Sequence, residues 1–99
     1  MAEAIYKVFM ARFSEAWYQL SEEEQNSFKA KMGEALEKAG GKSLMMCGTN
    51  WSSDQWSFAG MEEFPSIETV QNYMAAADEL NLFRYVEATS VLGTKFDSK

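Results

Sequence analysis

Histidine is absent from this 99-residue sequence, and cysteine and proline occur once each. Histidine is the commonest metal ligand and general base in proteins, and a structural zinc needs several cysteine or histidine ligands. The acidic run 22–24 has the character of a solvated helix start. The glycine pair at 40–41 follows a predicted helix, whereas a phosphate cradle opens one. We therefore expect no metal site and no bound cofactor.

Basic residues are also scarce, because 9 Lys and Arg stand against 15 Asp and Glu, for a formal net charge of −6. Nucleic-acid binding needs clustered Lys and Arg, and an anionic membrane surface repels a chain of this charge. No apolar stretch approaches the length of a membrane span, and residues 1–13 lack the uninterrupted apolar core of a signal peptide. We therefore expect neither nucleic acid nor membrane as a partner. The lone Cys47, within an apolar run, suits a reducing cytoplasm, which is the expected location.

The remaining composition is that of an ordinary globular protein, with 46% hydrophobic and 24% charged residues. At this length we expect a single domain over residues 1–99, large enough for a core and small enough to gain from self-association. The polar residues from about 94 to 99 are expected to form a flexible tail.

Alternation and capping signals predict the first half of the fold. Residues 4–13 alternate with apolar side chains on both faces, which is typical of a central strand covered on two sides. After a connector at 14–20, Ser21 and Glu24 have the spacing of a capping box that starts a helix. An apolar stripe follows at helical spacing, and Gly40-Gly41 provides a left-handed end. The stripe consists of Phe28, Met32, Ala35, Leu36 and Ala39.

The second half has the same strand, helix, strand order. Residues 42–51 and 55–64 are predicted as two strands of a hairpin, because the turn-forming residues 52–54 separate two apolar runs. Ser66 is the expected cap of a second helix, and Asn81 is its expected left-handed stop. A fourth strand is expected within 82–92, after a short irregular start. The stripe of the second helix is Val70, Tyr73, Met74, Ala77 and Leu80.

The resulting order, βαββαβ, predicts an α+β ferredoxin-like fold, with a four-stranded antiparallel sheet and two helices on one face. Tyrosine, methionine, phenylalanine and tryptophan occupy both sides of several predicted strands. An open apolar face of this size would be an association site. We therefore expect a homodimer in which two sheets close on each other as a dimeric α/β barrel.

This order, the length and the doubly apolar strands resemble the dimeric α/β-barrel superfamily. The superfamily includes cofactor-free quinone-forming monooxygenases, haem-degrading enzymes, polyketide cyclases, muconolactone isomerases and stress-responsive barrel proteins. The run AWYQLSEEEQNSF, residues 16–28, is similar to the Trp, Leu, Ser, Glu, Glu, Phe signature that opens the first helix in small darcynin-like members, which have no assigned activity. Members that depend on a histidine base or metal ligand are not models for this chain, since it has no histidine.

The predicted hairpin at 48–64 brings an amide and two indoles together, at Asn50, Trp51 and Trp56. The amide would anchor a carbonyl or phenol oxygen of an aromatic ligand, while the indoles would contact its ring. Alternatively, Asn50 serves the turn and the indoles fill the dimer core. Residues on the apolar stripe of a helix more often pack in the core than line a pocket. Three such residues, Phe28, Met32 and Tyr73, are nevertheless included in the candidate substrate-binding set. That set is Trp17, Phe28, Met32, Trp51, Trp56 and Tyr73.

Tyr6, Arg12 and Glu87 are polar heads on otherwise apolar strands, and with Asn50 they form the candidate catalytic set. Monooxygenases of the superfamily surround their aromatic substrate with an asparagine, a tryptophan and often an arginine or tyrosine. Asn50, Trp51 or Trp56, Arg12 and Tyr6 would supply those residue types, although their spacing does not match a motif of the family. Facing a cavity, Arg12 would stabilise an enolate or phenolate, and Tyr6 or Glu87 would move a proton. The alternative is that Arg12 and Glu87 pair with each other at a sheet edge.

Two functional hypotheses follow. The first is a protein that binds a small apolar, aromatic or polyketide-like molecule between sheet and helices, any activity being that of a cofactor-independent monooxygenase, cyclase or isomerase. The second is a non-catalytic dimeric binding or assembly module of the same fold, with a filled core. A cavity of a few hundred cubic ångströms reached by Asn50, Tyr6 or Arg12 would favour the first hypothesis, and a solid core would favour the second.

Overall fold

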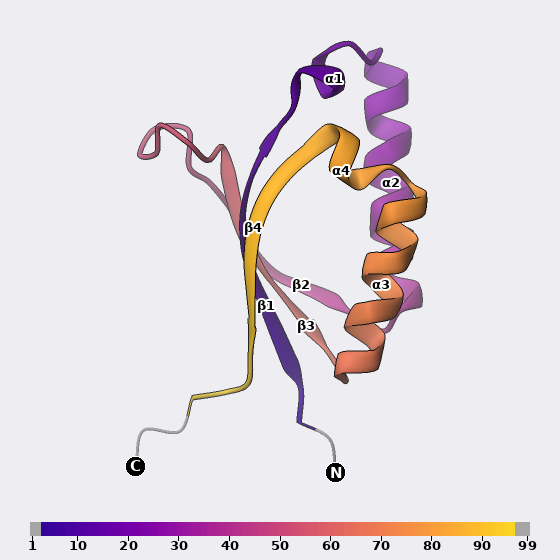
Figure 1. Ribbon diagram of the computed structural model, residues 1–99, viewed down its shortest axis with the longest axis vertical. Helices are drawn as coiled ribbons and strands as arrows, with labels where there is room; N and C mark the ends of the chain where they lie inside the picture. Colours follow the sequence, from indigo (N-terminus) through magenta and orange to yellow (C-terminus); the bar gives the residue numbers. More distant parts are fainter. Residues whose placement is uncertain (1–2, 97–99) are drawn as a thin grey trace.

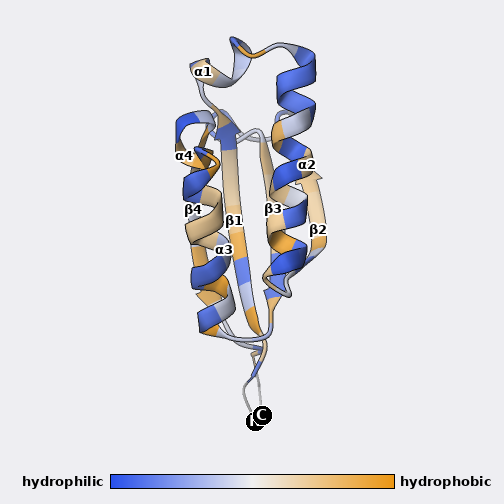
Figure 2. Ribbon diagram, turned by 90° about the vertical axis from the view of Figure 1, so that its right-hand side faces the viewer, coloured by the Kyte–Doolittle hydropathy of each residue, from blue (hydrophilic) through white to orange (hydrophobic). Residues whose placement is uncertain are grey.

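Strand β1 (Ile5–Phe13) lies in the middle of the sheet, which Figure 1 shows edge-on and Figure 2 shows face-on. The computed structural model describes residues 3–96, and within that range the sheet has four antiparallel strands in the order β2-β3-β1-β4. The other strands are β2 (Lys42–Gly48), β3 (Phe58–Phe64) and β4 (Val86–Gly93). The predicted ferredoxin-like α+β fold is confirmed.

Two long helices, α2 (Glu22–Lys38) and α3 (Ile67–Glu79), lie side by side over one face of the sheet (Figure 2). Each begins at the predicted serine cap. The Oγ of Ser21 accepts a hydrogen bond from the backbone N–H of Glu24 at 3.1 Å, and the Oγ of Ser66 accepts one from the N–H of Thr69 at 3.3 Å. Asn81 has a φ of 65°, which confirms the predicted left-handed stop.

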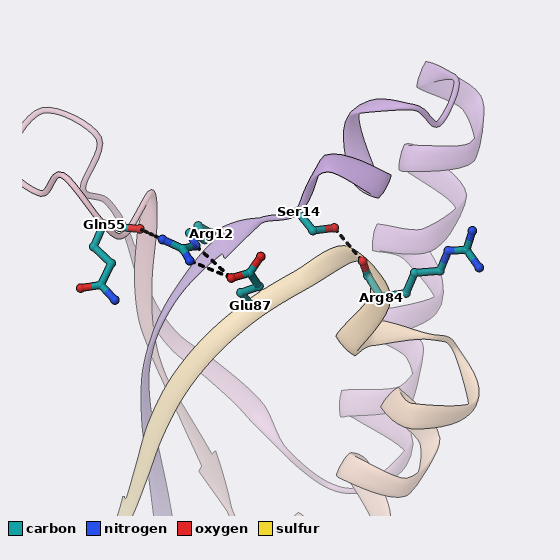
Figure 3. Close-up of polar contacts among 5 residues, drawn as sticks. All are labelled: Arg12, Ser14, Gln55, Arg84 and Glu87. Atoms are coloured by element: carbon teal, nitrogen blue, oxygen red, sulfur yellow. Dashed lines mark hydrogen bonds and ion pairs between the residues drawn. The ribbon is translucent and has the colours of Figure 1, made fainter.

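Two short helices replace segments that were predicted as irregular. The connector at 14–20 contains α1 (Glu15–Tyr18), and the start of the predicted fourth strand is α4 (Leu82–Tyr85). Ser14 fastens the first of these helices to the second, because its backbone N–H donates to the carbonyl of Tyr85 at 2.8 Å. Its Oγ also donates to the carbonyl of Arg84 at 2.6 Å (Figure 3). The two helices therefore close one end of the space between sheet and helices.

The hairpin strands are shorter than predicted. The predicted ranges 42–51 and 55–64 overrun the observed strands, because β2 ends at Gly48 and β3 begins at Phe58. Between them, the Oγ1 of Thr49 donates to the carbonyl of Trp56 at 2.7 Å, and the Oγ of Ser53 accepts from the N–H of Trp56 at 2.9 Å. These side chains satisfy backbone groups locally, and residues 49–57 form a loop that projects from the sheet (Figure 1).

The core is centred on Phe64, which has no exposed surface, and on Val70 and Tyr73, each 5% exposed. Chain reversal after α2 brings the backbone close to this centre. A Cβ on Gly41 would lie 2.8 Å from the Cε1 of Phe64, so a larger residue there would displace the phenylalanine ring. Of the predicted tail at 94–99, residues 94–96 carry no helix or strand, and residues 97–99 lie outside the described residues.

The sheet face that points away from the helices, here called the outer face, has an apolar centre. Val8 is paired with Met61 on one side and with Val91 on the other, so an apolar row crosses the sheet. These three residues are 41%, 37% and 67% exposed in the single chain. Met10 and Met45, also on this face, are exposed as well. The outer face thus provides the open apolar surface on which the expected dimer depends.

Candidate functional site

A cavity of about 830 Å³ lies between the inner face of the sheet and the helices. Its floor comes from alternate residues of β1 and from their neighbours on β3 and β4, and its roof comes from α2 and α3. Phe9 and Phe58 belong to the floor, and Met32 and Met74 to the roof. Aromatic and methionine side chains therefore dominate the lining, which suits an apolar ligand.

The helix-closed end of the cavity is an aromatic cluster around Trp17. This indole is 3% exposed and stacks on the ring of Phe13, with centroids 4.5 Å apart and planes 12° apart. Phe28 and Tyr85 meet the indole edge-on at 5.6 and 6.3 Å. The hydrogen bonds of Ser14 to the carbonyls of Tyr85 and Arg84 join α1 to α4, the helices that supply Trp17 and Tyr85. It gives the cavity one rigid, apolar end.

Phe9 lies directly over the backbone of Gly60, its partner in the sheet register. A Cβ at residue 60 would come within 2.7 Å of the Cζ of Phe9 and within 3.0 Å of the Sδ of Met46. Both of these side chains line the cavity. The glycine therefore allows the floor of the cavity to lie close to the sheet.

The polar part of the cavity is formed by Lys7 and Glu62, which face each other on β1 and β3. The lysine Nζ lies 4.0 Å from the glutamate Oε1, and the two side chains are only 12% and 10% exposed. The same Nζ contacts the Sδ of Met74 at 3.3 Å and lies 5.5 Å from the ring centre of Tyr73. Among residues 3–96, the Oε1 of Glu62 is a buried side-chain oxygen with no hydrogen-bond partner.

Burial dominates the electrostatics of this group. It raises the pKa of Glu62 and lowers the pKa of Lys7, and in each case attraction to the other charge opposes the shift only in part. Burial also raises the pKa of Tyr73, and the neighbouring Glu62 carboxylate adds to that shift. The phenol of Tyr73 is therefore neutral over the ordinary pH range.

The raised pKa of Glu62 predicts a stability effect with a definite sign. The folded chain binds this proton more tightly than the unfolded chain, so the free energy of unfolding should fall as the pH rises from 4.5 through the raised pKa. Lys7 has a lowered pKa and acts with the opposite sign at alkaline pH. Urea unfolding between pH 4.5 and neutrality should show this slope in the natural chain and not in Glu62→Gln. Equal slopes for both chains would contradict it.

The candidate catalytic residues do not form one site. Asn50 lines the cavity, but Tyr6, Arg12 and Glu87 are absent from its lining and lie on the outer face. The Nη2 of Arg12 donates to the Oε1 of Glu87 at 2.7 Å, and its Nη1 donates to the carbonyl of Gln55 at 3.5 Å (Figure 3). This is the pairing between Arg12 and Glu87 that the sequence left open as an alternative. Of the two strands that carry the pair, β4 is at an edge of the sheet and β1 is central.

The candidate binding residues divide in the same way. Trp17, Phe28, Met32 and Tyr73 line the cavity. Trp51 is 88% exposed in the loop, and the ring of Trp56 lies 5.6 Å from the guanidinium carbon of Arg12. Neither of these two indoles lines the cavity, so the cavity brings neither of them together with Asn50.

Sequence reasoning missed Lys7 and Glu62, although a signal for the first was present. In the alternation of residues 4–13, Lys7 shares a face with Ile5, Phe9 and Ala11, where an ionisable side chain has no place in a simple core. Glu62 has a weaker signal, because it adjoins a second glutamate near the end of a predicted strand. Only the register shows that the two residues are partners.

The residues of the cavity do not suit a haem iron or a divalent metal. The sequence has no histidine, Cys47 pairs with Ala59 in the sheet register and does not line the cavity, and the raised pKa of Tyr73 disfavours a phenolate ligand. Within the described part of the chain, no group of three or more His, Cys, Asp or Glu side chains could hold a metal ion. None of the described helices is long and apolar enough to cross a membrane.

No family model and no curated protein matches the chain. Among solved structures, the chain is similar to a variant of chlorite dismutase from Candidatus Nitrospira defluvii, with a TM-score of 0.76 and 12% identity over 99% of this chain and 42% of that one. It is also similar to a protein of unknown function from Rhodopseudomonas palustris, with a TM-score of 0.68 and 15% identity over 99% and 86% of the two chains.

The chain shares the fold of these proteins. It spans only about two-fifths of the length of the chlorite dismutase chain, since the match covers 42% of that chain. Sequence identities of 12% and 15% carry the similarity no further than the fold.

Proposed function

We propose that this protein binds a small, mostly apolar molecule, aromatic or polyketide-like, in the cavity between sheet and helices. The observation that carries the proposal is the cavity itself, whose volume of about 830 Å³ lies within the range of small-molecule sites. A filled core would have favoured the alternative of a non-catalytic assembly module. The flexible side chains of Met32, Met46 and Met74 allow the lining to adapt to its ligand.

Any chemistry in this cavity has to use the side chains that line it. These include Lys7, Glu62 and Tyr73, which can hold or move protons, and Asn50, which can only donate and accept hydrogen bonds; the set is a poor one for a metal. An activity of this protein would therefore fall among cofactor-independent oxygenases, cyclases or isomerases. Kinship with small darcynin-like members of the dimeric α/β-barrel superfamily is part of the proposal. In the matching run, Trp17 is buried in the cavity wall, and Ser21 caps α2.

We also propose a homodimer that joins two outer faces. Strands about 4.8 Å apart, with about 3.4 Å per residue, give this face a projected area of roughly 500 Å². Pleated side chains expose more surface than their projection, so the face approaches the roughly 800 Å² that each partner buries in a standard interface. Cys47, an exposed free thiol in the single chain, would lie near this interface, and such a thiol suits the proposed cytoplasmic location.

Filling the cavity from its rim tests the binding proposal. Gly33 of α2 lines the cavity, and a Cβ there would meet no atom within 4 Å. Gly33→Phe should therefore fold and obstruct the cavity, whereas the matched Gly33→Ala should only favour the helix. We expect the neutral probe N-phenyl-1-naphthylamine to bind the natural chain and Gly33→Ala alike. Its affinity for Gly33→Phe should be lower by about tenfold or more, because the new phenylalanine ring would occupy cavity space in which the probe otherwise makes apolar contacts.

Fluorescence titration of the probe measures these affinities, and native mass spectrometry of the freshly purified chain can detect a ligand carried from the cell. Equal affinity for all three chains would show that the probe binds outside the cavity. That result would contradict the proposed function.

A further inference from the structure

The polar pair in the cavity is not a completed ion pair. A charge-assisted hydrogen bond has a donor–acceptor distance of about 2.7–2.9 Å, whereas the Nζ of Lys7 and the Oε1 of Glu62 are 4.0 Å apart. Glu62 is only 8% exposed, and the described residues offer its Oε1 no hydrogen bond. A buried polar atom without a partner destabilises the fold, so it needs a group that the protein side chains around it do not supply.

The surroundings of the pair indicate where such a group would come from. Both residues line the cavity, and the Nζ of Lys7 lies 5.6 Å from the ring centre of Phe9 and 5.5 Å from that of Tyr73. The hydrogen-bond acceptor of this Nζ among residues 3–96 is the sulfur of Met74, which is a weak acceptor. A ligand that fills the apolar space can therefore reach a strong donor and a strong acceptor at its wall.

We propose that Lys7 and Glu62 together anchor a hydroxyl group on the aromatic ligand, so that the bound molecule is a phenol or another hydroxyarene. The ligand O–H donates to the carboxylate of Glu62, and the same oxygen accepts from the ammonium of Lys7. The Oε1 of Glu62 is buried in the chain without a ligand, so binding requires the carboxylate to turn toward the cavity. Two hydrogen bonds of about 2.8 Å to one ligand oxygen can then span a gap close to the observed 4.0 Å. This inference rests on the proposed function and adds the chemical class of the ligand.

Charge considerations favour a hydroxyl over other polar groups. A carboxylate on the ligand would be repelled by Glu62, and an ammonium group would be repelled by Lys7. A hydroxyl both donates and accepts, and it adds no charge to a buried site. Burial raises the pKa of Glu62 and lowers the pKa of Lys7, so for both residues it favours the uncharged form. A hydroxyl can hydrogen-bond to either protonation state of the pair.

The test compares 1-naphthol with naphthalene, which has the same ring system without the hydroxyl, and with 1-naphthoate, which carries a charge. Equilibrium dialysis against the full chain gives the three affinities. We expect 1-naphthol to bind about tenfold more tightly than naphthalene, as is typical of one hydrogen bond to a charged group, and more tightly than 1-naphthoate.

The decisive variant is the double substitution Lys7→Met with Glu62→Met. Replacing a buried ion pair by apolar residues of similar length is commonly neutral for folding. The variant should therefore still bind naphthalene, to within about twofold, and lose the preference for 1-naphthol. Glu62→Gln keeps an acceptor oxygen and should retain part of the preference. Lys31→Met, which removes an exposed charge from α2 outside the cavity, should behave like the natural chain.

The outcomes distinguish failure of the proposed hydroxyl-binding pair, Lys7 and Glu62, from failure of the proposed ligand-binding function. Equal binding of 1-naphthol and naphthalene to the natural chain, or a preference that persists in the double variant, would overturn the anchor and leave the ligand cavity in place. Tighter binding of 1-naphthoate would also overturn the anchor, since it would assign an anion to the site. Binding of none of the three compounds would overturn the proposed function and the anchor with it.

Discussion

Substitution of Val8 by Glu is expected to convert the proposed homodimer into a folded monomer. Val8 lies at the centre of the outer face, between Met61 and Val91 in the sheet register. A dimer through this face would bury the new carboxylate twice, next to the apolar side chains of Met61 and Val91. Each unpaired buried charge costs several kcal/mol, which corresponds to weaker association by roughly a hundredfold or more.

Sedimentation velocity at micromolar concentration measures the association, and circular dichroism checks that the variant is folded. Ile67→Glu is the matched control, because Ile67 is 48% exposed against 41% for Val8 but lies at the start of α3, away from the outer face. The control should sediment like the natural chain. A natural chain that sediments as a soluble monomer would refute the interface, and so would dissociation of the control.

Substitution of Phe64 by Ala is expected to produce the largest loss of stability in the chain. Phe64 has no exposed surface and packs against Tyr73, with ring centres 5.5 Å apart. Truncating a buried phenylalanine costs about 3–5 kcal/mol in lost burial and residual cavity. Small domains have only about 5–15 kcal/mol of unfolding free energy in total, so the variant should be close to unfolding at ambient temperature.

Urea denaturation at fixed protein concentration gives the difference in unfolding free energy. Phe96→Ala makes the same truncation at a side chain that is 86% exposed, and it should change the stability by less than about 0.5 kcal/mol. Similar losses for the two variants would show that the stability does not depend on the proposed centre of the core.

The fold was largely predictable because local signals and the global arrangement agree. Residues 4–13 alternate as a central strand should, and Ser21 and Glu24 form the predicted capping box. The strand ends near residues 49–57 were not predictable in the same way. Trp51 and Trp56 favour a strand by residue type, whereas Thr49 and Ser53 bond to backbone groups that the ladder would otherwise use.

The site was predicted less well, because the choice of sheet face depends on register. Tyr6, Arg12 and Glu87 have the residue types of a catalytic set, but they lie on the face opposite the cavity. A shift of one residue in a strand exchanges its two faces, and sequence alone does not fix this choice when both faces are apolar. Cavity-lining residues on helices, such as Phe28 and Tyr73, were found because the helical period identifies the inward stripe directly.

The contact between Phe9 and the backbone of Gly60 gives the protein a simple means of changing its selectivity. Any side chain at position 60 would push the phenylalanine ring away from the sheet, since even a Cβ comes within 2.7 Å of it. The backbone of β2 would have to shift as well, since the same Cβ comes within 3.0 Å of the carbonyl oxygen of Met45. The ring would then occupy depth that a guest now has, and bulkier guests would be excluded first. A homologue with alanine or serine at this position would therefore be adapted to slimmer molecules, without any change in the helices above.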